Sequence, residues 1–122
     1  MIAKYKYMEI INREFDVSHE QIISRSRKKL LKEVRLVLWW AMREGGYSYP
    51  AIGKYTGRDH STILRLLNMY SGKYQEKGKI INEILTKGIE YKNLADFEVK
   101  TIKIPDYSQD KIIEIQRVIK KV

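Results

Sequence analysis

Gly57 lies between two short helical patterns, and this arrangement constrains the fold of the chain more than any other feature of its sequence. Before it, Ser48 is a suitable N-cap, and Pro50 falls in the first turn of a short helix, where the missing N–H of proline costs nothing. After it, Asp59 is a suitable N-cap for a second helix. That helix has an apolar side of Ile63, Leu66, Leu67 and Tyr70 and a polar side of Ser61, Arg65 and Asn68. A short helix, a glycine turn and an amphipathic helix together predict a helix-turn-helix.

Most of the remaining sequence up to residue 92 also has apolar residues at helical spacing. The expected elements are a helix around residues 7–15, a short helix opened by the capping box of Ser18 and Gln21, a long helix over residues 25–44, and a sixth helix after Gly72 and Gly78. The core face predicted for the long helix consists of Leu30, Val34, Val37, Leu38 and Ala41. The predicted fold class is therefore mainly α, a multi-helix bundle with a helix-turn-helix.

The texture of the sequence changes after Asn93. Residues 97–104 alternate between apolar and polar types, which predicts one short strand. Ser108 is then expected to open an amphipathic helix whose apolar face holds Ile112, Ile115, Val118, Ile119 and Val122. We therefore expect two parts, a helix-turn-helix domain over residues 1–92 and a C-terminal extension over residues 93–122.

Trp39 provides a reason for that extension to be ordered. It is expected to lie away from the predicted core face of the long helix, so a bare helical domain would leave its indole partly in water. Residues 94–122 are expected either to fold back on the helices or to pair with the same segment of a second chain as a homodimer. The sequence is equally compatible with both arrangements.

The residue types that catalysis and metal binding need are scarce. The chain has no cysteine and only two histidines, His19 and His60, and the pair of Asp59 and His60 has no second acidic residue nearby. No phosphate-binding loop of the form G-x-x-x-x-G-K-[ST] is present. We expect no enzyme, no metal, no nucleotide and no cofactor. The absence of long apolar runs and of cysteine further predicts a cytoplasmic protein without a membrane segment.

A formal charge of +9 indicates an anionic partner. Six lysines and arginines fall between Arg25 and Arg35, against the single acid Glu33. Taken alone, this run is also typical of the solvated face of a helix.

Three motifs in the expected order make residues 4 to about 90 resemble the C-terminal DNA-binding domain of the bacterial replication initiator DnaA. They are "ISRSRKKLLKEVR", "YSYPAIG" and "IGKYTGRDHSTI". The last is similar to the family signature I-G-x-x-x-G-x-R-D-H-[ST]-T-[VI]. The resemblance implies double-stranded DNA as the partner, with the fold of the TrpR and DnaA-like helix-turn-helix superfamily.

The resemblance also implies roles for individual residues. Arg27 occupies the position of the arginine that enters the minor groove, and residues 58–62 occupy the positions that read base edges in the major groove. Arg43, Tyr49 and Pro50 stand where the family touches the sugar-phosphate backbone. The complete set expected to contact DNA is Arg25, Arg27, Lys28, Arg43, Tyr49, Pro50, Arg58, Asp59, His60, Ser61, Thr62 and Arg65.

Initiators of this family carry an AAA+ ATPase module ahead of this domain, whereas only a few residues precede the resemblance here. We therefore expect a DNA-reading module that does not melt an origin by ATP-driven assembly. Its expected function is sequence-specific DNA binding as an accessory of replication or transcription, on a phage or another mobile element. The alternative is an interaction module that docks a replication or transcription partner through the C-terminal extension, with DNA binding secondary.

Overall fold

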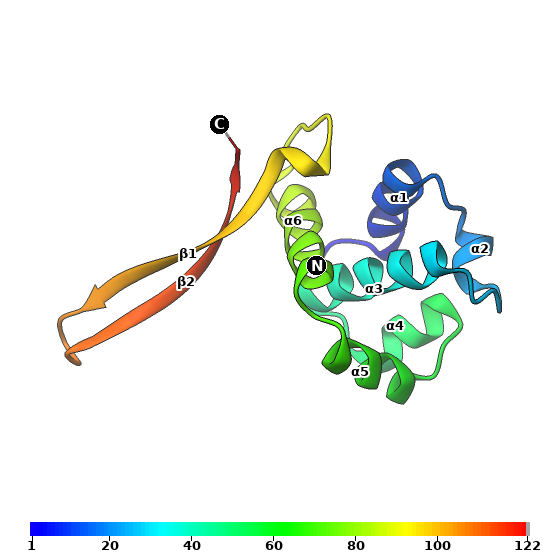
Figure 1. Cartoon of the computed structure of the whole chain (residues 1–122), viewed down its shortest axis with the longest axis horizontal. Helices are drawn as coiled ribbons and strands as arrows, with labels where there is room; N and C mark the ends of the chain where they lie inside the picture. Colours follow the sequence, from blue (N-terminus) through cyan, green and yellow to red (C-terminus); the bar gives the residue numbers. More distant parts are fainter. Residues whose placement is uncertain (122) are drawn as a thin grey trace.

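The computed structural model describes residues 1–121, which form a helical body and a projecting β-hairpin (Figure 1). The helices are α1 (Lys4–Phe15), α2 (His19–Ile23), α3 (Lys29–Glu44), α4 (Tyr49–Thr56), α5 (His60–Met69) and α6 (Lys73–Lys87). A 3-10 turn, Leu94–Asp96, then leads into the antiparallel strands β1 (Phe97–Asp106) and β2 (Lys111–Lys120). The mainly α class is confirmed. None of the described helices is long and apolar enough to cross a membrane.

The centre of the helical body is α3, which contacts each of the other five helices. Six successive residues of α3, numbers 34–39, are buried, so this helix is surrounded by protein on all sides rather than on one face. Val34, Val37, Leu38 and Ala41 lie in the core as predicted. Leu30 does not, because it is in the first turn of α3 and is 54% exposed.

The side chain of Trp39 is covered by the helical body and not by the C-terminal extension, contrary to the sequence-based expectation. Trp39 is 2% exposed, and its indole N–H donates to the hydroxyl of Thr56 at 3.1 Å. The Thr56 hydroxyl in turn donates to the Ile52 carbonyl at 2.8 Å. The end of α4 therefore supplies the polar partner that a buried indole requires.

Local signals correctly predicted where several helices begin and end. The capping box at α2 is formed by Ser18 and Gln21, and the Ser48 side chain accepts a hydrogen bond from the N–H of Ala51 at the start of α4. Gly57 ends α4 in the left-handed conformation, with φ of +69°, which glycine adopts without strain. The long helix begins at Lys29 and not at Arg25, because residues 24–28 are held in a separate segment described below.

Gly78 lies inside α6, although the sequence suggested that the helix begins after it. It is buried where α6 crosses α3. A Cβ atom at this position would come within 2.7 Å of both the Ala41 nitrogen and the Trp40 Cβ. The glycine therefore permits close packing of the two helices and does not mark a boundary between elements.

The helix predicted after Ser108 is wrong, because this segment forms strand β2. Ser108 lies in the turn between the strands, where its N–H donates to the Asp106 side chain at 3.1 Å. The apolar residues of the segment are all β-branched, which favours strand over helix, and β1 pairs with the segment along its whole length. Val122, the last residue assigned to the predicted helix face, lies outside the described residues.

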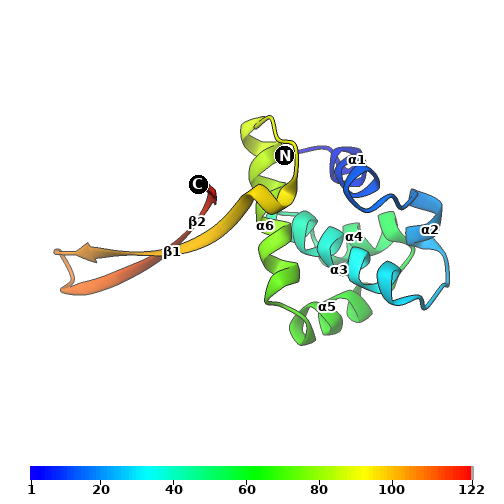
Figure 2. The same cartoon turned by 45° about the horizontal axis from the view of Figure 1, so that its top comes forward.

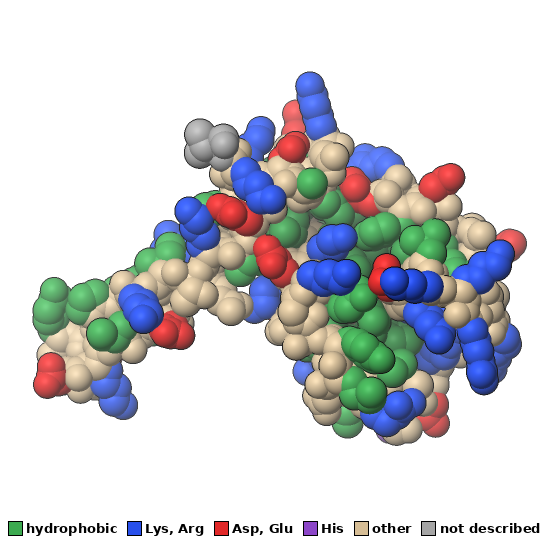
Figure 3. Space-filling view, in the orientation of Figure 1, with side chains coloured by type: hydrophobic (Ala, Val, Ile, Leu, Met, Phe, Trp, Pro, Cys, Tyr) green, Lys and Arg blue, Asp and Glu red, His purple; other side chains and the backbone are tan. Residues whose placement is uncertain are grey.

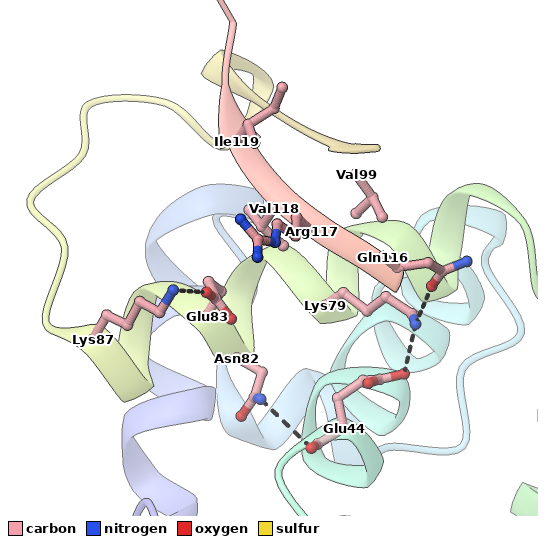
Figure 4. Close-up of a pocket in the computed structure, with 10 residues that line it drawn as sticks. All are labelled: Glu44, Lys79, Asn82, Glu83, Lys87, Val99, Gln116, Arg117, Val118 and Ile119. Carbon is pink, nitrogen blue, oxygen red and sulfur yellow. Dashed lines mark hydrogen bonds and ion pairs between the residues drawn. The ribbon is translucent and has the colours of Figure 1, made fainter. Parts of the chain in front are cut away.

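The two halves of the hairpin have different surroundings. The base packs against α6, where Leu94 and Phe97 are buried in the same core as the helices. Lys79 of α6 bridges to the Glu44 carboxylate at 3.8 Å and donates to Gln116 of β2, beside a cleft of about 630 Å³ (Figure 4). The far half of the hairpin extends away from the helices in both views (Figures 1 and 2).

Candidate nucleic-acid interface

Residues 24–28 form a basic arm between α2 and α3. The Ser24 hydroxyl donates to the Gln21 carbonyl at 2.6 Å and accepts from the Ser26 N–H at 3.4 Å. The Ser26 hydroxyl then accepts from the Lys28 N–H at 3.3 Å. These short-range bonds give the arm a defined path without helix or strand. The side chains of Arg25, Arg27 and Lys28 are exposed along it.

Arg35 of α3 fixes the position of this arm through hydrogen bonds to its backbone. It is only 5% exposed, and its guanidinium donates to four carbonyls, those of Ile22 at 2.7 Å, Ser24 at 2.9 Å, Ser26 at 2.9 Å and Gln21 at 3.3 Å. Burial lowers the pKa of Arg35 from its usual value, and the nearby charge of Arg58 lowers it further. The carbonyls therefore replace water around a buried charge that has no carboxylate partner among the described residues.

Sequence alone does not separate Arg35 from its basic neighbours. It belongs to the basic run from Arg25 to Arg35, whose composition fits either a DNA-binding surface or a solvated helix face. One signal was present, since the apolar residues Leu36 and Trp39 share the side of α3 that holds Arg35, and both are buried in the structure. Arg35 is thus a positioning residue for the arm, and its guanidinium already makes four hydrogen bonds within the protein.

Arg58, at the turn before α5, also donates hydrogen bonds to the backbone of this arm. Its guanidinium donates to the Ser24 carbonyl at 2.6 Å, to the Ile23 carbonyl at 3.2 Å and to the Gly57 carbonyl at 3.2 Å. The Ser24 carbonyl is therefore shared between Arg58 and Arg35. Burial, followed by the charge of Arg25, lowers the pKa of Arg58. The structure directs this side chain toward the backbone of the arm, although the sequence predicted it to read base edges.

The first turn of α5 is exposed next to Arg58. One carboxylate oxygen of Asp59 accepts from the Ser61 N–H at 2.8 Å and from the Ser61 hydroxyl at 2.7 Å, so the predicted N-cap is formed. These two hydrogen bonds lower the pKa of Asp59. His60 and Ser61 are exposed, and the His60 ring lies 3.8 Å from the Asp59 carboxylate. Thr62 is half-buried.

The outer face of α5 continues the exposed surface beyond its first turn. Arg65 and Asn68 are exposed, as the amphipathic pattern predicted, and the Arg65 guanidinium lies 3.8 Å from the Met69 sulfur. Ile63 and Leu67 are fully buried on the opposite side. The expectation of a solvent-exposed polar face on this helix is therefore confirmed.

Arg43, Tyr49 and Pro50 meet where α3 ends and α4 begins. The Arg43 guanidinium lies 4.3 Å from the centre of the Tyr49 ring and donates to the Tyr47 carbonyl at 2.9 Å. Pro50 is exposed in the first turn of α4. Stacking on the ring fixes the direction of the Arg43 side chain while leaving it charged and half-exposed.

Lysine and arginine side chains gather over the part of the body that holds α2 and the start of α3, beside the first turn of α5 (Figure 3). The exposed members of this basic surface are Arg25, Arg27, Lys28, Lys29 and Lys32. The only acid nearby on α3, Glu33, is half-buried and accepts from the hydroxyl of Tyr74 at 3.2 Å. Within residues 1–121, no three of His, Asp and Glu lie close enough together to hold a metal ion.

When the chain is compared with models of known protein families, it matches a helix-turn-helix domain. The match covers residues 6–68, which is 63 of the 122 residues and extends from α1 almost to the end of α5. The family is the bacterial dnaA protein helix-turn-helix, and the chain belongs to it. This family is a DNA-binding domain and not a catalytic module. No solved structure matched the chain.

Proposed function

We propose that the chain binds double-stranded DNA in a sequence-specific manner, with the first turn of α5 in the major groove and the basic arm in an adjacent minor groove. The single observation that carries this proposal is that two adjacent residues hold the arm and the start of α5. Arg58 binds the Ser24 carbonyl, and Asp59, the next residue, caps α5. The arm and the exposed helix start are therefore linked at a fixed spacing before DNA is present, which is what reading two grooves at once requires.

The proposed contacts differ in kind along this surface. His60, Ser61 and Thr62 are short side chains at a helix start, so they allow base edges to come close, and Arg65 extends the same face. Arg27, with Arg25 and Lys28 beside it, suits the negative potential of a narrow A·T-rich minor groove. Arg43, Tyr49 and Pro50 are assigned to the sugar-phosphate backbone.

Two residues of the predicted contact set have a structural task as well. Asp59 caps α5, and Arg58 binds the arm. We propose that Asp59 contributes to base reading only through its exposed second oxygen, and that Arg58 acts mainly by setting the position of the arm. The role we propose for the whole chain is that of an accessory of replication or transcription acting on DNA.

Selection of bound sequences from a random duplex library tests this function. The expected result is one enriched site with an A·T-rich flank. His60→Ala is expected to relax preference within the core of the site by about 1–3 kcal/mol, and Arg27→Ala to relax preference in the flank. Lys92→Ala is the matched control, because it removes an exposed charge beside the base of the hairpin.

Two outcomes would contradict DNA reading by this surface. One is the absence of any enriched site. The other is an affinity that does not change in the Arg27→Ala plus His60→Ala double variant. Either outcome would favour the alternative function, in which the C-terminal extension docks a protein partner and DNA binding is secondary.

A further inference from the structure

The two faces of the hairpin differ in chemistry beyond its base. In an antiparallel pair, residues directly opposite one another point to the same side. One side of the far half therefore holds the opposed pairs Thr101 with Gln116 and Lys103 with Glu114, followed next to the turn by Pro105 with Ile112. The other side holds Ile102 opposite Ile115 and Ile104 opposite Ile113. We call the second group, residues 102, 104, 113 and 115, the isoleucine face.

The isoleucine face has no cover within the described chain. Phe97, Val99 and Val118, which pack against the helical core, belong to the opposite side of the ribbon. Ile104, Ile113 and Ile115 remain 36%, 44% and 37% exposed. Hydrophobic side chains are visible along the projecting hairpin in Figure 3. Four neighbouring isoleucines on a ribbon that extends into solvent form a patch of the kind that a partner usually covers.

A partner on the isoleucine face would also stabilise the far half of the hairpin. Two strands alone are marginally stable in water, and an independent sheet needs a third strand or a hydrophobic face packed on another element. The base of this hairpin has α6, whereas the far half has no such support among residues 1–121. Covering the isoleucine face would supply it.

The charges around the isoleucine face favour a second copy of the chain as the partner. Residues 101–116 carry two lysines against Asp106, Asp110 and Glu114, so this half of the hairpin does not attract DNA. At the end of the face nearer the helices, the opposed pair is Lys100 and Arg117. At the far end Asp106 lies opposite Lys111, and the turn carries Asp110, so two acids and one lysine leave this end with one net negative charge.

We infer that the chain forms a two-fold homodimer in which the isoleucine faces of two hairpins stack in opposite directions. A two-fold axis that crosses the strands lays the base of one hairpin over the tip of the other. Lys100 and Arg117 of one copy then lie over the tip of the second, which carries one net negative charge. Stacking in the same direction would instead place the two Lys100 and Arg117 pairs against each other. The two helical bodies project from opposite ends of the stacked ribbons. Four isoleucines per copy cover much less than the 800 Å² or so per partner of a standard interface, so the dimer is weak and reversible.

Sedimentation equilibrium over a concentration series up to about 1 mM tests this dimer. The two informative variants replace neighbouring residues on opposite faces with threonine, which keeps the β-branched shape. Ile104→Thr with Ile113→Thr is expected to raise the dimer dissociation constant at least about 100-fold, because four isoleucines are lost per dimer. Lys103→Thr with Glu114→Thr, the matched control, is expected to change it by no more than about twofold.

A crosslinking experiment separates stacked faces from strands paired edge to edge. The natural chain has no cysteine, so one cysteine can be placed on either face of β2. With a short bis-maleimide, Ile113→Cys is expected to give a covalent dimer and Glu114→Cys to remain a monomer. Far-UV circular dichroism and thermal unfolding of each variant check that the hairpin still folds.

A wild-type chain that remains monomeric at the highest concentration would overturn the inference, as would equal crosslinking from both faces or equal dimerisation of the two threonine variants. The dimer does not depend on the proposed DNA binding. The isoleucine variants are expected to bind a duplex carrying one site as the wild type does, so a failure of the dimer and a failure of DNA reading are distinguishable.

Discussion

Arg35 shows at the scale of one residue how a charged side chain can be structural. Its four hydrogen bonds all go to carbonyls of residues 21–26, and all three nitrogens of the guanidinium take part in them. In Arg35→Lys, one ammonium group replaces the fork and leaves several carbonyls without a donor. We expect a loss of about 2–3 kcal/mol in the free energy of unfolding, measured by urea titration.

The control for this prediction is the same chemical change on the exposed arm. Arg27→Lys is expected to alter the unfolding free energy by less than about 0.5 kcal/mol, because no hydrogen bond of the folded chain involves that side chain among the described contacts. If Arg35→Lys is as stable as Arg27→Lys, the carbonyl cluster does not hold the arm in the way described.

Asp59 gives a prediction for the dependence of stability on pH. Hydrogen bonds from Ser61 lower its pKa in the folded chain, so folding favours the ionised form. The stabilisation is complete above the unfolded pKa of about 3.9 and is lost as the pH falls through the lower folded value. The difference in unfolding free energy between wild type and Asp59→Ala is therefore expected to be constant from about pH 7 to pH 5 and to shrink below about pH 4. A difference that stays the same down to pH 2 would contradict a charged cap.

At the scale of elements, the crossing of α3 and α6 depends on Gly78. On helix propensity alone, Gly78→Ala would stabilise α6 by about 1 kcal/mol. The added Cβ would instead lie 2.7 Å from atoms of Trp40 and Ala41, so we expect the substitution to destabilise the chain by roughly 1–3 kcal/mol in thermal or urea unfolding. Thr86→Ala, an exposed change in the same helix, is the control and is expected to be neutral or slightly stabilising.

Elements whose ends depend on local hydrogen bonds were predictable from the sequence. The caps at Ser18, Ser48 and Asp59 each bond to a backbone N–H two or three residues away, and a reader of the sequence can see both partners. The exposed start of α5 and its buried side were predictable for the same reason. Arg25, Arg27 and Lys28 could be recognised as exposed and basic, but their extended path could not, because it depends on the distant side chains of Arg35 and Arg58.

The errors fall where long-range contacts decide the structure. Gly78 is inside a helix because α3 passes close to it, and Trp39 is covered because Thr56 of another helix reaches its indole. The apolar spacing of residues 112–119 fits a helix face, yet pairing with β1 makes it a strand. Neither the approach of two helices nor the presence of a pairing partner can be read from a single segment.

At the scale of the whole molecule, the basic surface and the isoleucine face lie on separate parts, so their effects should separate. A shortened hairpin in which an Asn-Gly turn joins Thr101 directly to Gln116 would remove the isoleucine face and keep the base that packs on α6. The removed segment, residues 102–115, carries two lysines and three acids, so its loss takes no positive charge from the DNA surface. Binding to a duplex with one selected site is expected to keep both its affinity and its salt dependence, because the same phosphate contacts release the same counterions.

On a duplex with two sites, the wild type is expected to bind cooperatively, since the stacked hairpins bring the second helical body to a high local concentration. The shortened chain is expected to bind the two sites independently. Fluorescence anisotropy on the two duplexes, at two or more salt concentrations, measures both effects. Cooperative binding that persists in the shortened chain would mean that contacts elsewhere, or the DNA itself, couple the sites.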